Sequence, residues 1–140
     1  MQLETPIVIT ELDAARIRDL GTRLPVTGHA AHGLRDLLEQ VTNEADIVAS
    51  PLVAQDVVTM NSTVSFTDAL TGSVHRVTVV YPWDVSVGDR RISVLSPVGR
   101  ALLGRSTGGD SSIDMPDGTT RSIRLGPVHY QPEAAGECTR

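Results

Sequence analysis

The feature that most constrains this sequence is a change in the spacing of its apolar residues near Ser50-Pro51. Before that point apolar residues recur every three or four positions, as they do on one face of a helix. After it they alternate with polar residues, as they do in strands with one buried face. The sequence therefore predicts an α+β fold, with a helical part over residues 1–50 and a sheet part over residues 51–140.

Two helices are expected in the first part. The first opens at Thr10, whose hydroxyl is suited to cap it, with Asp13 three residues further on and Glu11 beside the positive end of the helix dipole. The second has a clear apolar stripe with helical spacing, made of Leu34, Leu37, Leu38, Val41, Ala45 and Val48. Because the connection between them is short, the helices should pack as an antiparallel hairpin, a short coiled coil.

The second part is rich in β-branched residues and turn residues, which favour a mostly antiparallel sheet. Strands are expected at 57–60, 63–67, 74–81, 92–95, 112–115, 120–125 and 128–130. Residues 96–104 interrupt them, because a serine, then a proline and finally a glycine are typical of the start and end of a short helix. We expect residues 51–140 to fold without the hairpin.

Composition narrows the class of protein. The 140 residues are 40% hydrophobic and carry a net charge of −5, which suits a globular chain and argues against strong binding to nucleic acid. No apolar run approaches the roughly 20 residues that a membrane helix needs, and the N-terminus lacks a signal-peptide pattern. The single Cys138 forms no internal disulfide. A cytoplasmic location and no membrane partner are expected.

Catalytic patterns are weak. Two pairs of carboxylates are candidates for acid–base chemistry, Glu44 with Asp46 and Asp114 with Asp117. Residues two apart on a helix point away from each other, and Asp117 belongs to a turn, so both pairs are better explained as solvated surface. His29 and His32 are too few to make a zinc site, and the glycine-rich residues 104–109 lack the lysine of a phosphate loop. No catalytic residue, metal or cofactor is predicted, and the chain is not expected to be an enzyme.

Several blocks together resemble a known family. They are Asp56 to Ser62, Tyr81-Pro82, Ser96 to Gly104 and Tyr130 to Glu133. In this order the blocks are similar to the Rnk group, the regulators of nucleoside diphosphate kinase, and more loosely to the C-terminal domain of the GreA/GreB transcription elongation factors. The resemblance implies a C-terminal domain like the FK506-binding proteins, with antiparallel strands beside one short helix.

The resemblance also implies a partner, which is RNA polymerase at the rim of its secondary channel. The polymerase-binding residues that it indicates are Ser96, Pro97, Val98, Gly99 and Arg100. Leu95 stands where Gre factors often have Asp or Asn. We expect Ser96 to cap the short helix and Arg100 to project, exposed, toward the partner.

The tip of the hairpin decides what such a protein does in the channel. In Gre factors an acidic tip helps to hold the catalytic magnesium that drives transcript cleavage. Here the tip residues are Pro25, Val26, Thr27, Gly28 and His29, and none is acidic. The resemblance therefore implies competition with Gre factors without stimulation of cleavage.

Two other functions remain open. The family name suggests a regulator of the level or activity of nucleoside diphosphate kinase. The implied fold also occurs in prolyl isomerases, but their pockets are lined with aromatic residues and this chain is only 3% aromatic. The sequence does not determine the oligomeric state, and a monomer is favoured.

Overall fold

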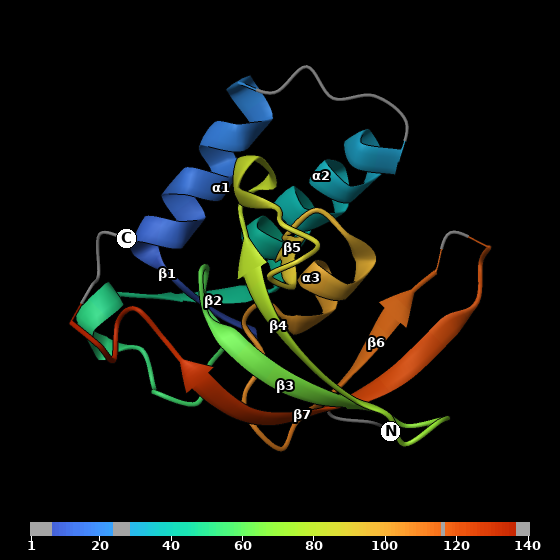
Figure 1. Cartoon of the computed structure of the whole chain (residues 1–140). Coiled ribbons are helices and arrows are strands. Elements are labelled where there is room, and N and C mark those ends of the chain that lie inside the picture. The colour runs from blue at the N-terminus through green and yellow to red at the C-terminus, as the bar shows by residue number, and fades with distance from the viewer. Residues whose placement is uncertain (1–6, 24–28, 116, 137–140) are drawn as a thin grey trace.

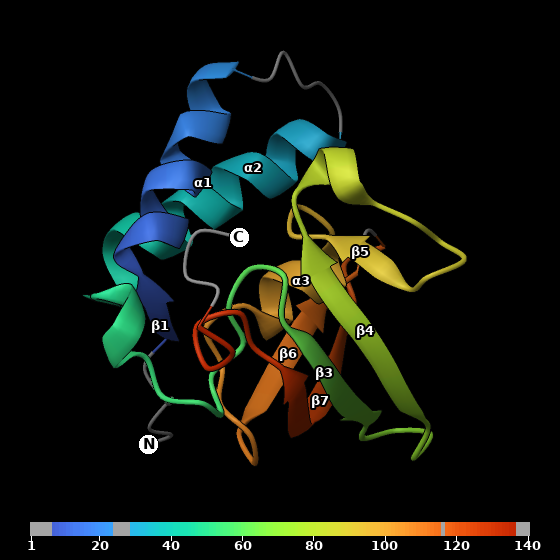
Figure 2. The same cartoon turned by 60° about the vertical axis from the view of Figure 1, so that its left-hand side comes forward.

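The computed structural model describes residues 7–23, 29–115 and 117–136, with the two N-terminal helices at one end of the molecule and a curled sheet at the other (Figures 1 and 2). The helices are α1 (Glu11–Arg23), α2 (His29–Glu39) and α3 (Pro97–Leu102), with a π-helical turn at Gln40–Glu44 and 3-10 turns at Ser50–Leu52 and Pro82–Asp84. The strands are β1 (Ile7–Thr10), β2 (Ala45–Val48), β3 (Thr63–Asp68), β4 (Val74–Val80), β5 (Arg91–Ser93), β6 (Asp110–Asp114) and β7 (Thr120–Tyr130). Among the described residues, no helix is long and apolar enough to cross a membrane.

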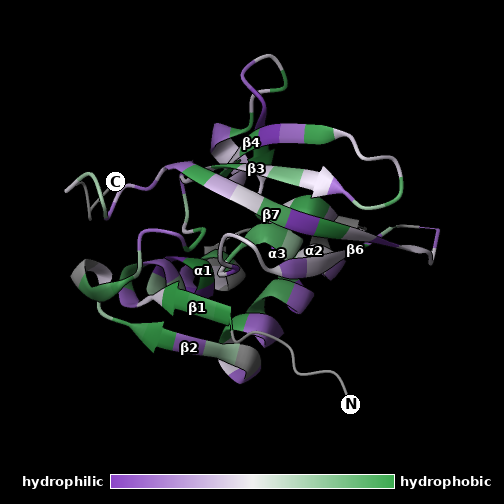
Figure 3. Ribbon diagram, turned by 90° about the horizontal axis from the view of Figure 1, so that it is seen from below, coloured by the Kyte–Doolittle hydropathy of each residue, from purple (hydrophilic) through white to green (hydrophobic). Residues whose placement is uncertain are grey.

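The larger sheet has five strands in the order β5-β4-β3-β7-β6. Three of its pairings are antiparallel, as predicted, but β5 runs parallel to β4, so the sheet is mixed. Side chains of β3 alternate between half-buried and buried along the strand. Figure 3 shows the same alternation as purple and green bands along β7. The alternation in the sequence therefore reflects one face turned to the core.

The strands predicted at 120–125 and 128–130 are one continuous strand, β7. The break was predicted at Gly126-Pro127, but β7 runs through it beside β3 with a shift in register. A Cβ at Gly126 would lie 3.1 Å from the carbonyl oxygen of Ser65, so the missing side chain lets the two backbones approach closely.

The strand predicted at 57–60 is wrong. Val57 makes one isolated bridge to Ser106, and the chain then turns, with Asn61 at a φ of 65°. All four residues from Val57 to Met60 are buried, so their side chains do not alternate between core and solvent. The β-branched residues here reflect burial of an irregular segment and not a strand.

The end of the second predicted helix is also wrong. α2 ends at Glu39, and after the π-helical turn Ala45 and Val48 belong to β2, which pairs in parallel with β1. Strand β1, which ends at Thr10, was not predicted. Each strand has only four residues, too few to show a period, and the apolar spacing of α2 continues by coincidence into β2.

The two predicted helices are present, and the chain runs outward through α1 and returns through α2 (Figure 2). With 13 and 11 residues they make a short hairpin. The cap on α1 is as predicted, because the backbone N–H of Asp13 donates to the Thr10 hydroxyl at 3.1 Å. The tip, residues 24–28, lies outside the described residues.

The helices and the sheet share one hydrophobic core. Ile17 of α1 and Leu37 of α2 belong to the same buried cluster as Val64 of β3 and Leu102 of α3. Gly104, at a φ of 80°, also joins the two parts, because its carbonyl accepts a hydrogen bond from the N–H of Val8 in β1 at 3.0 Å. The domain boundary at residues 50 and 51 stays a prediction about folding units.

Candidate functional site

The predicted polymerase-binding loop is a rigid turn at the start of α3. The Ser96 hydroxyl accepts a hydrogen bond from the N–H of Gly99 at 3.1 Å and donates one to the carbonyl of Ser93 at 2.6 Å. Pro97 follows at the first helical position. The predicted cap is confirmed, and the side chain of Ser96 ties the helix to the end of β5.

Two glycines let this loop lie close to its neighbours. A Cβ at Gly99 would collide with the carbonyl oxygen of Ser93, and a Cβ at Gly33 in α2 would collide with the carbonyl oxygen of Leu95. Gly33 was not among the predicted site residues. Its signal in the sequence is a glycine inside a helical pattern, where the usual cost in helix propensity calls for a packing reason.

Arg100 does not project into solvent. Its side chain is 14% exposed, and Nη1 lies 3.7 Å from Oδ2 of Asp36 in α2. The side chain of Gln40 donates to the Arg100 carbonyl at 3.3 Å. The prediction of an exposed Arg100 is therefore wrong, because α2 passes directly over α3. Whether the loop binds polymerase stays a prediction.

The other residues of the loop are also partly or fully buried. Pro97 is half-buried, Val98 packs against the core as a partly buried residue, and Gly99 is buried. Ser96 is also half-buried, so only part of the loop surface is open to solvent.

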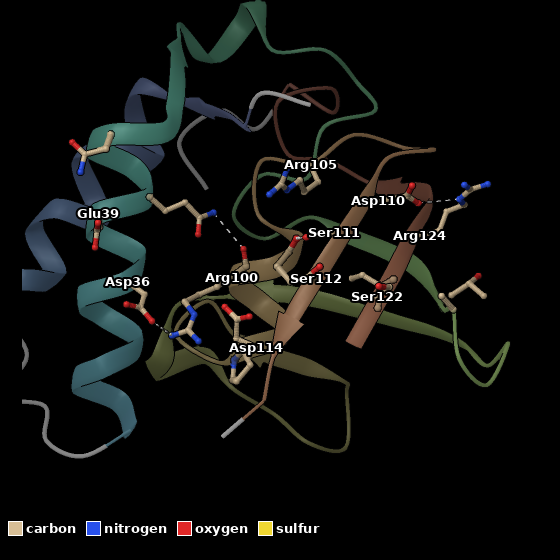
Figure 4. Close-up of a pocket in the computed structure, with 17 residues that line it drawn as sticks. Asp36, Glu39, Arg100, Arg105, Asp110, Ser111, Ser112, Asp114, Ser122 and Arg124 are labelled. Carbon is tan, nitrogen blue, oxygen red and sulfur yellow. Dashed lines mark hydrogen bonds and ion pairs between the residues drawn. The ribbon is translucent and has the colours of Figure 1, made fainter. Parts of the chain in front are cut away.

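A broad groove opens beside the loop. It has a volume of about 1140 Å³ and lies between α2 on one side and β6 and β7 on the other, with α3 at its base (Figure 4). Figure 4 shows Asp36 reaching toward Arg100, and Asp110 toward Arg124. The lining is mostly charged and polar. No local sequence pattern indicates this groove, because strands and helices far apart in the chain form it.

A second polar cluster joins α1 to the sheet part. Oδ2 of Asp13 accepts the N–H of Met60 at 3.0 Å, and Thr59 donates to Oε1 of Glu133 at 2.6 Å. Asp13 is 3% exposed. Burial raises the pKa of its carboxyl from 3.8 to about 6, the Met60 hydrogen bond opposes this, and the charge of Glu133 adds to it. Burial likewise raises the pKa of the Tyr81 hydroxyl, with the nearby Asp13 carboxylate adding to the effect.

The predicted tip residues cannot be placed. Pro25, Val26, Thr27 and Gly28 lie outside the described residues, and His29 is described only as the first residue of α2. Within residues 7–23, 29–115 and 117–136, no group of three His, Cys, Asp or Glu side chains could hold a metal ion.

The fold agrees with the comparisons with known proteins. Residues 53–130 match the family described as "Transcription elongation factor, GreA/GreB, C-term". The matched range contains the whole five-stranded sheet, α3 and the loop that precedes it. This chain therefore belongs to the GreA/GreB family.

Within that family, the chain is a homologue of the Rnk group. It is 36% identical over 131 residues to the "Regulator of nucleoside diphosphate kinase" of Escherichia coli, covering 94% of each chain. It is also 35% identical over 96 residues to the "Transcription inhibitor protein Gfh1" of Thermus thermophilus, covering 67% of this chain and 60% of that one. A solved GreA/GreB factor from Nitrosomonas europaea is 35% identical, with a TM-score of 0.70 over 91% of this chain and 100% of that one.

Proposed function

We propose that this protein is a transcription regulator that binds RNA polymerase at the rim of the secondary channel. It occupies the place of Gre factors there and does not stimulate transcript cleavage. The observation that carries the proposal is the Ser96-capped start of α3, which is held rigidly against both β5 and α2 inside the region that matches the family. A rigid surface binds without the loss of entropy that ordering a loop would cost.

The absence of cleavage activity follows from the hairpin. Its helices of 13 and 11 residues are about 20 Å and 17 Å long at 1.5 Å per residue. The tip sequence Pro25 to His29 contains no carboxylate to hold a metal ion. A short, uncharged tip can occupy a channel, but it supplies no ligand to a magnesium ion there.

A cytoplasmic location goes with this proposal, because bacterial polymerase works in the cytoplasm. The relatives named as a regulator and as a transcription inhibitor support a function without catalysis.

The test is a binding and cleavage assay with purified polymerase. We expect the protein to bind polymerase, to be displaced by excess Gre factor and to inhibit Gre-stimulated cleavage of backtracked complexes. Cleavage that increases with this protein alone, or binding that excess Gre factor leaves unchanged, would contradict the proposal.

A matched pair of variants tests the loop itself. Pro97→Glu adds a negative charge at the first turn of α3, a position where helices tolerate acidic residues, and should weaken polymerase binding. Thr71→Glu adds the same charge at the exposed turn between β3 and β4 and should leave binding unchanged. Equal loss in both variants would mean that charge alone, and not the loop, controls binding.

A second function rests on the name of one relative, the regulator of nucleoside diphosphate kinase. If this chain acts directly on the kinase, adding it to purified kinase should change the rate of phosphate transfer. An unchanged rate at saturating protein would exclude a direct action on the kinase. Any effect on kinase level would then be indirect, through transcription.

A further inference from the structure

The groove beside α3 contains an open strand edge. β6 is the last strand of the five-stranded sheet, bonded to β7 on one side only. Its other edge faces the groove, opposite α2 (Figure 4). An unpaired strand edge is a template on which another extended chain can form backbone hydrogen bonds.

The register shows which backbone groups are available. The N–H of Leu125 bonds to the carbonyl of Gly109, and the N–H of Met115 bonds to the carbonyl of Thr119. Because paired and unpaired positions alternate along an antiparallel ladder, the backbone groups of Ser111 and Ile113 point toward β7. The remaining N–H and C=O groups, those of Asp110, Ser112 and Asp114, point toward the groove. All three residues are exposed.

The groove is large enough for one more strand. Five residues of β6 extend about 17 Å at 3.4 Å per residue, and a neighbouring strand would lie about 4.8 Å away. The groove volume of about 1140 Å³ spans the length of β6 and is walled on the far side by Asp36, Glu39, Gln40 and Asn43. A strand added to β6 would therefore lie between two walls, with α3 at its base.

The charges that line the groove indicate which kind of chain could bind there. The groove is lined by four acidic residues, Asp36, Glu39, Asp110 and Asp114, and by three arginines, Arg100, Arg105 and Arg124. Two of the acids are in ion pairs, Asp36 with Arg100 and Asp110 with Arg124. Asp114 has no ion pair within the described part of the chain, and it stands directly on the open edge. A basic side chain opposite Asp114 would be favoured.

The same charges disfavour a second copy of this chain. Two β6 strands paired antiparallel about Ser112 would put Asp110 of each copy opposite Asp114 of the other. Like charges in directly opposite positions destabilise a strand pair. The edge is therefore suited to a different chain, with cations where this chain has carboxylates.

We propose that β6 accepts an extended, basic segment of a partner protein as a sixth strand, laid in the groove between β6 and α2. The segment carries Lys or Arg at alternate positions, so that its basic side chains face Asp110 and Asp114. This inference does not depend on the proposed polymerase function.

The test uses isotope-labelled full-length protein and a nine-residue peptide in which Lys and Thr alternate. Its control is the same peptide with methyl groups on those backbone nitrogens that would face β6, which keeps the charge but removes the hydrogen-bond donors. We expect the first peptide to shift the NMR signals of Asp110, Ser112 and Asp114 and to slow hydrogen exchange at their N–H groups. The methylated peptide should bind at least about tenfold more weakly.

A pair of protein variants tests the same bonds from the other side. Ser112→Pro removes a backbone N–H that points into the groove and leaves the ladder to β7 intact, since proline is tolerated at an open strand edge. It should weaken peptide binding by about tenfold or more, whereas Ser112→Ala keeps the N–H and should bind like the parent. If Ser112→Pro fails to fold, the two peptides still decide the question.

Three results would overturn the proposal. One is equal binding of the two peptides, which would mean attraction by charge only. Another is a set of shifted signals that leaves out β6. The third is no binding at peptide concentrations of about 5 mM, in which case Asp110 and Asp114 serve only to keep other strands away from the edge.

Discussion

The two sheets of this protein show different relations between sequence and structure. In the five-stranded sheet, β3 alternates buried and half-buried side chains along its length, and the alternation is visible in the sequence. In the two-stranded sheet, β1 and β2 have four residues each, and the helical hairpin separates them in the chain. The two strands that pair are more than 30 residues apart in the sequence. Periodicity in the sequence thus predicts a strand with one buried and one more exposed face. It does not predict a short strand that is stabilised mainly by pairing with a distant strand.

The first way to test this comparison is to ask whether the helical part and the sheet part unfold together. Leu37→Ala removes a fully buried side chain of α2 from the shared core. It should destabilise the protein by about 2 to 5 kcal/mol. Urea unfolding should be followed by circular dichroism for the helices and by the fluorescence of Trp83, which stacks on Tyr81 in the sheet part.

With one shared core, both signals should shift together by the same amount. Ile123→Ala in β7, also buried in the cluster, is the matched control. Its circular dichroism and fluorescence midpoints should also shift together. A fluorescence midpoint that Leu37→Ala leaves unchanged would instead support separate folding units divided near residue 50.

The second test concerns the buried carboxyl that joins the parts. The pKa of Asp13 is raised from 3.8 to about 6 in the folded protein, so the folded state binds the proton more tightly than the unfolded state. Its contribution to stability is therefore complete below about pH 4 and is lost as the pH rises through about 6. At about 1.4 kcal/mol per pKa unit the loss is roughly 3 kcal/mol.

Asp13→Asn keeps an oxygen that can accept the N–H of Met60 but does not titrate. Urea unfolding at pH 4 and pH 7 should show a smaller decrease in stability for this variant than for the parent. Asp56→Asn, at an exposed position, serves as the control and should retain the parental decrease. An unchanged pH dependence in Asp13→Asn would show that another group is responsible.

The third test asks how closely α2 must approach the α3 loop. Alanine usually stabilises a helix relative to glycine by about 1 kcal/mol. Gly33→Ala should instead destabilise the protein by about 1 to 3 kcal/mol, because the new Cβ would collide with the backbone of Leu95. Gly88→Ala, where a Cβ meets nothing within 4 Å, should have little effect on the thermal midpoint. A stabilised Gly33→Ala protein would mean that α2 can move away from the loop at little cost.

The smallest expected effects come from the two ion pairs of the groove. Arg124→Ala breaks a pair within the sheet whose side chains are 69% and 67% exposed, and it should change stability by less than about 0.5 kcal/mol. Arg100→Ala breaks a pair between the two parts, where the arginine is 14% exposed and its stem is packed. Its cost should be larger, about 1 kcal/mol. Chemical denaturation of both variants in parallel would show the order, and a reversed order would contradict the burial argument.

Local signals in the sequence predicted the local features of the fold. The caps at Thr10 and Ser96 and the helix end at Gly104 each depend on a few neighbouring residues, and each is present. β3 and β4 were predicted within one residue of their bounds. These features depend on side-chain chemistry that acts over one turn or one strand.

Features that depend on distant contacts were missed. Arg100 was predicted to be exposed, because nothing in its neighbourhood indicates that α2 passes over it. Asp13 was interpreted only by its position three residues after the Thr10 cap, while its partner Met60 lies 47 residues away. The family resemblance is confirmed, but it did not reveal the groove beside α3 or the open edge of β6.

The parallel pairing of β1 with β2 has a consequence for how such hairpins can vary in length. The register runs from Ile7 with Ala45 to Thr10 with Val48 and closes the base of the hairpin. The start of α1 and the end of the segment after α2 are therefore held at fixed positions. Inserting seven residues into each helix would extend the hairpin by about 10 Å and bring the tip back to almost the same rotational position, since seven residues make nearly two turns. The reach of the hairpin can therefore evolve in steps, while its anchor to the sheet part stays the same.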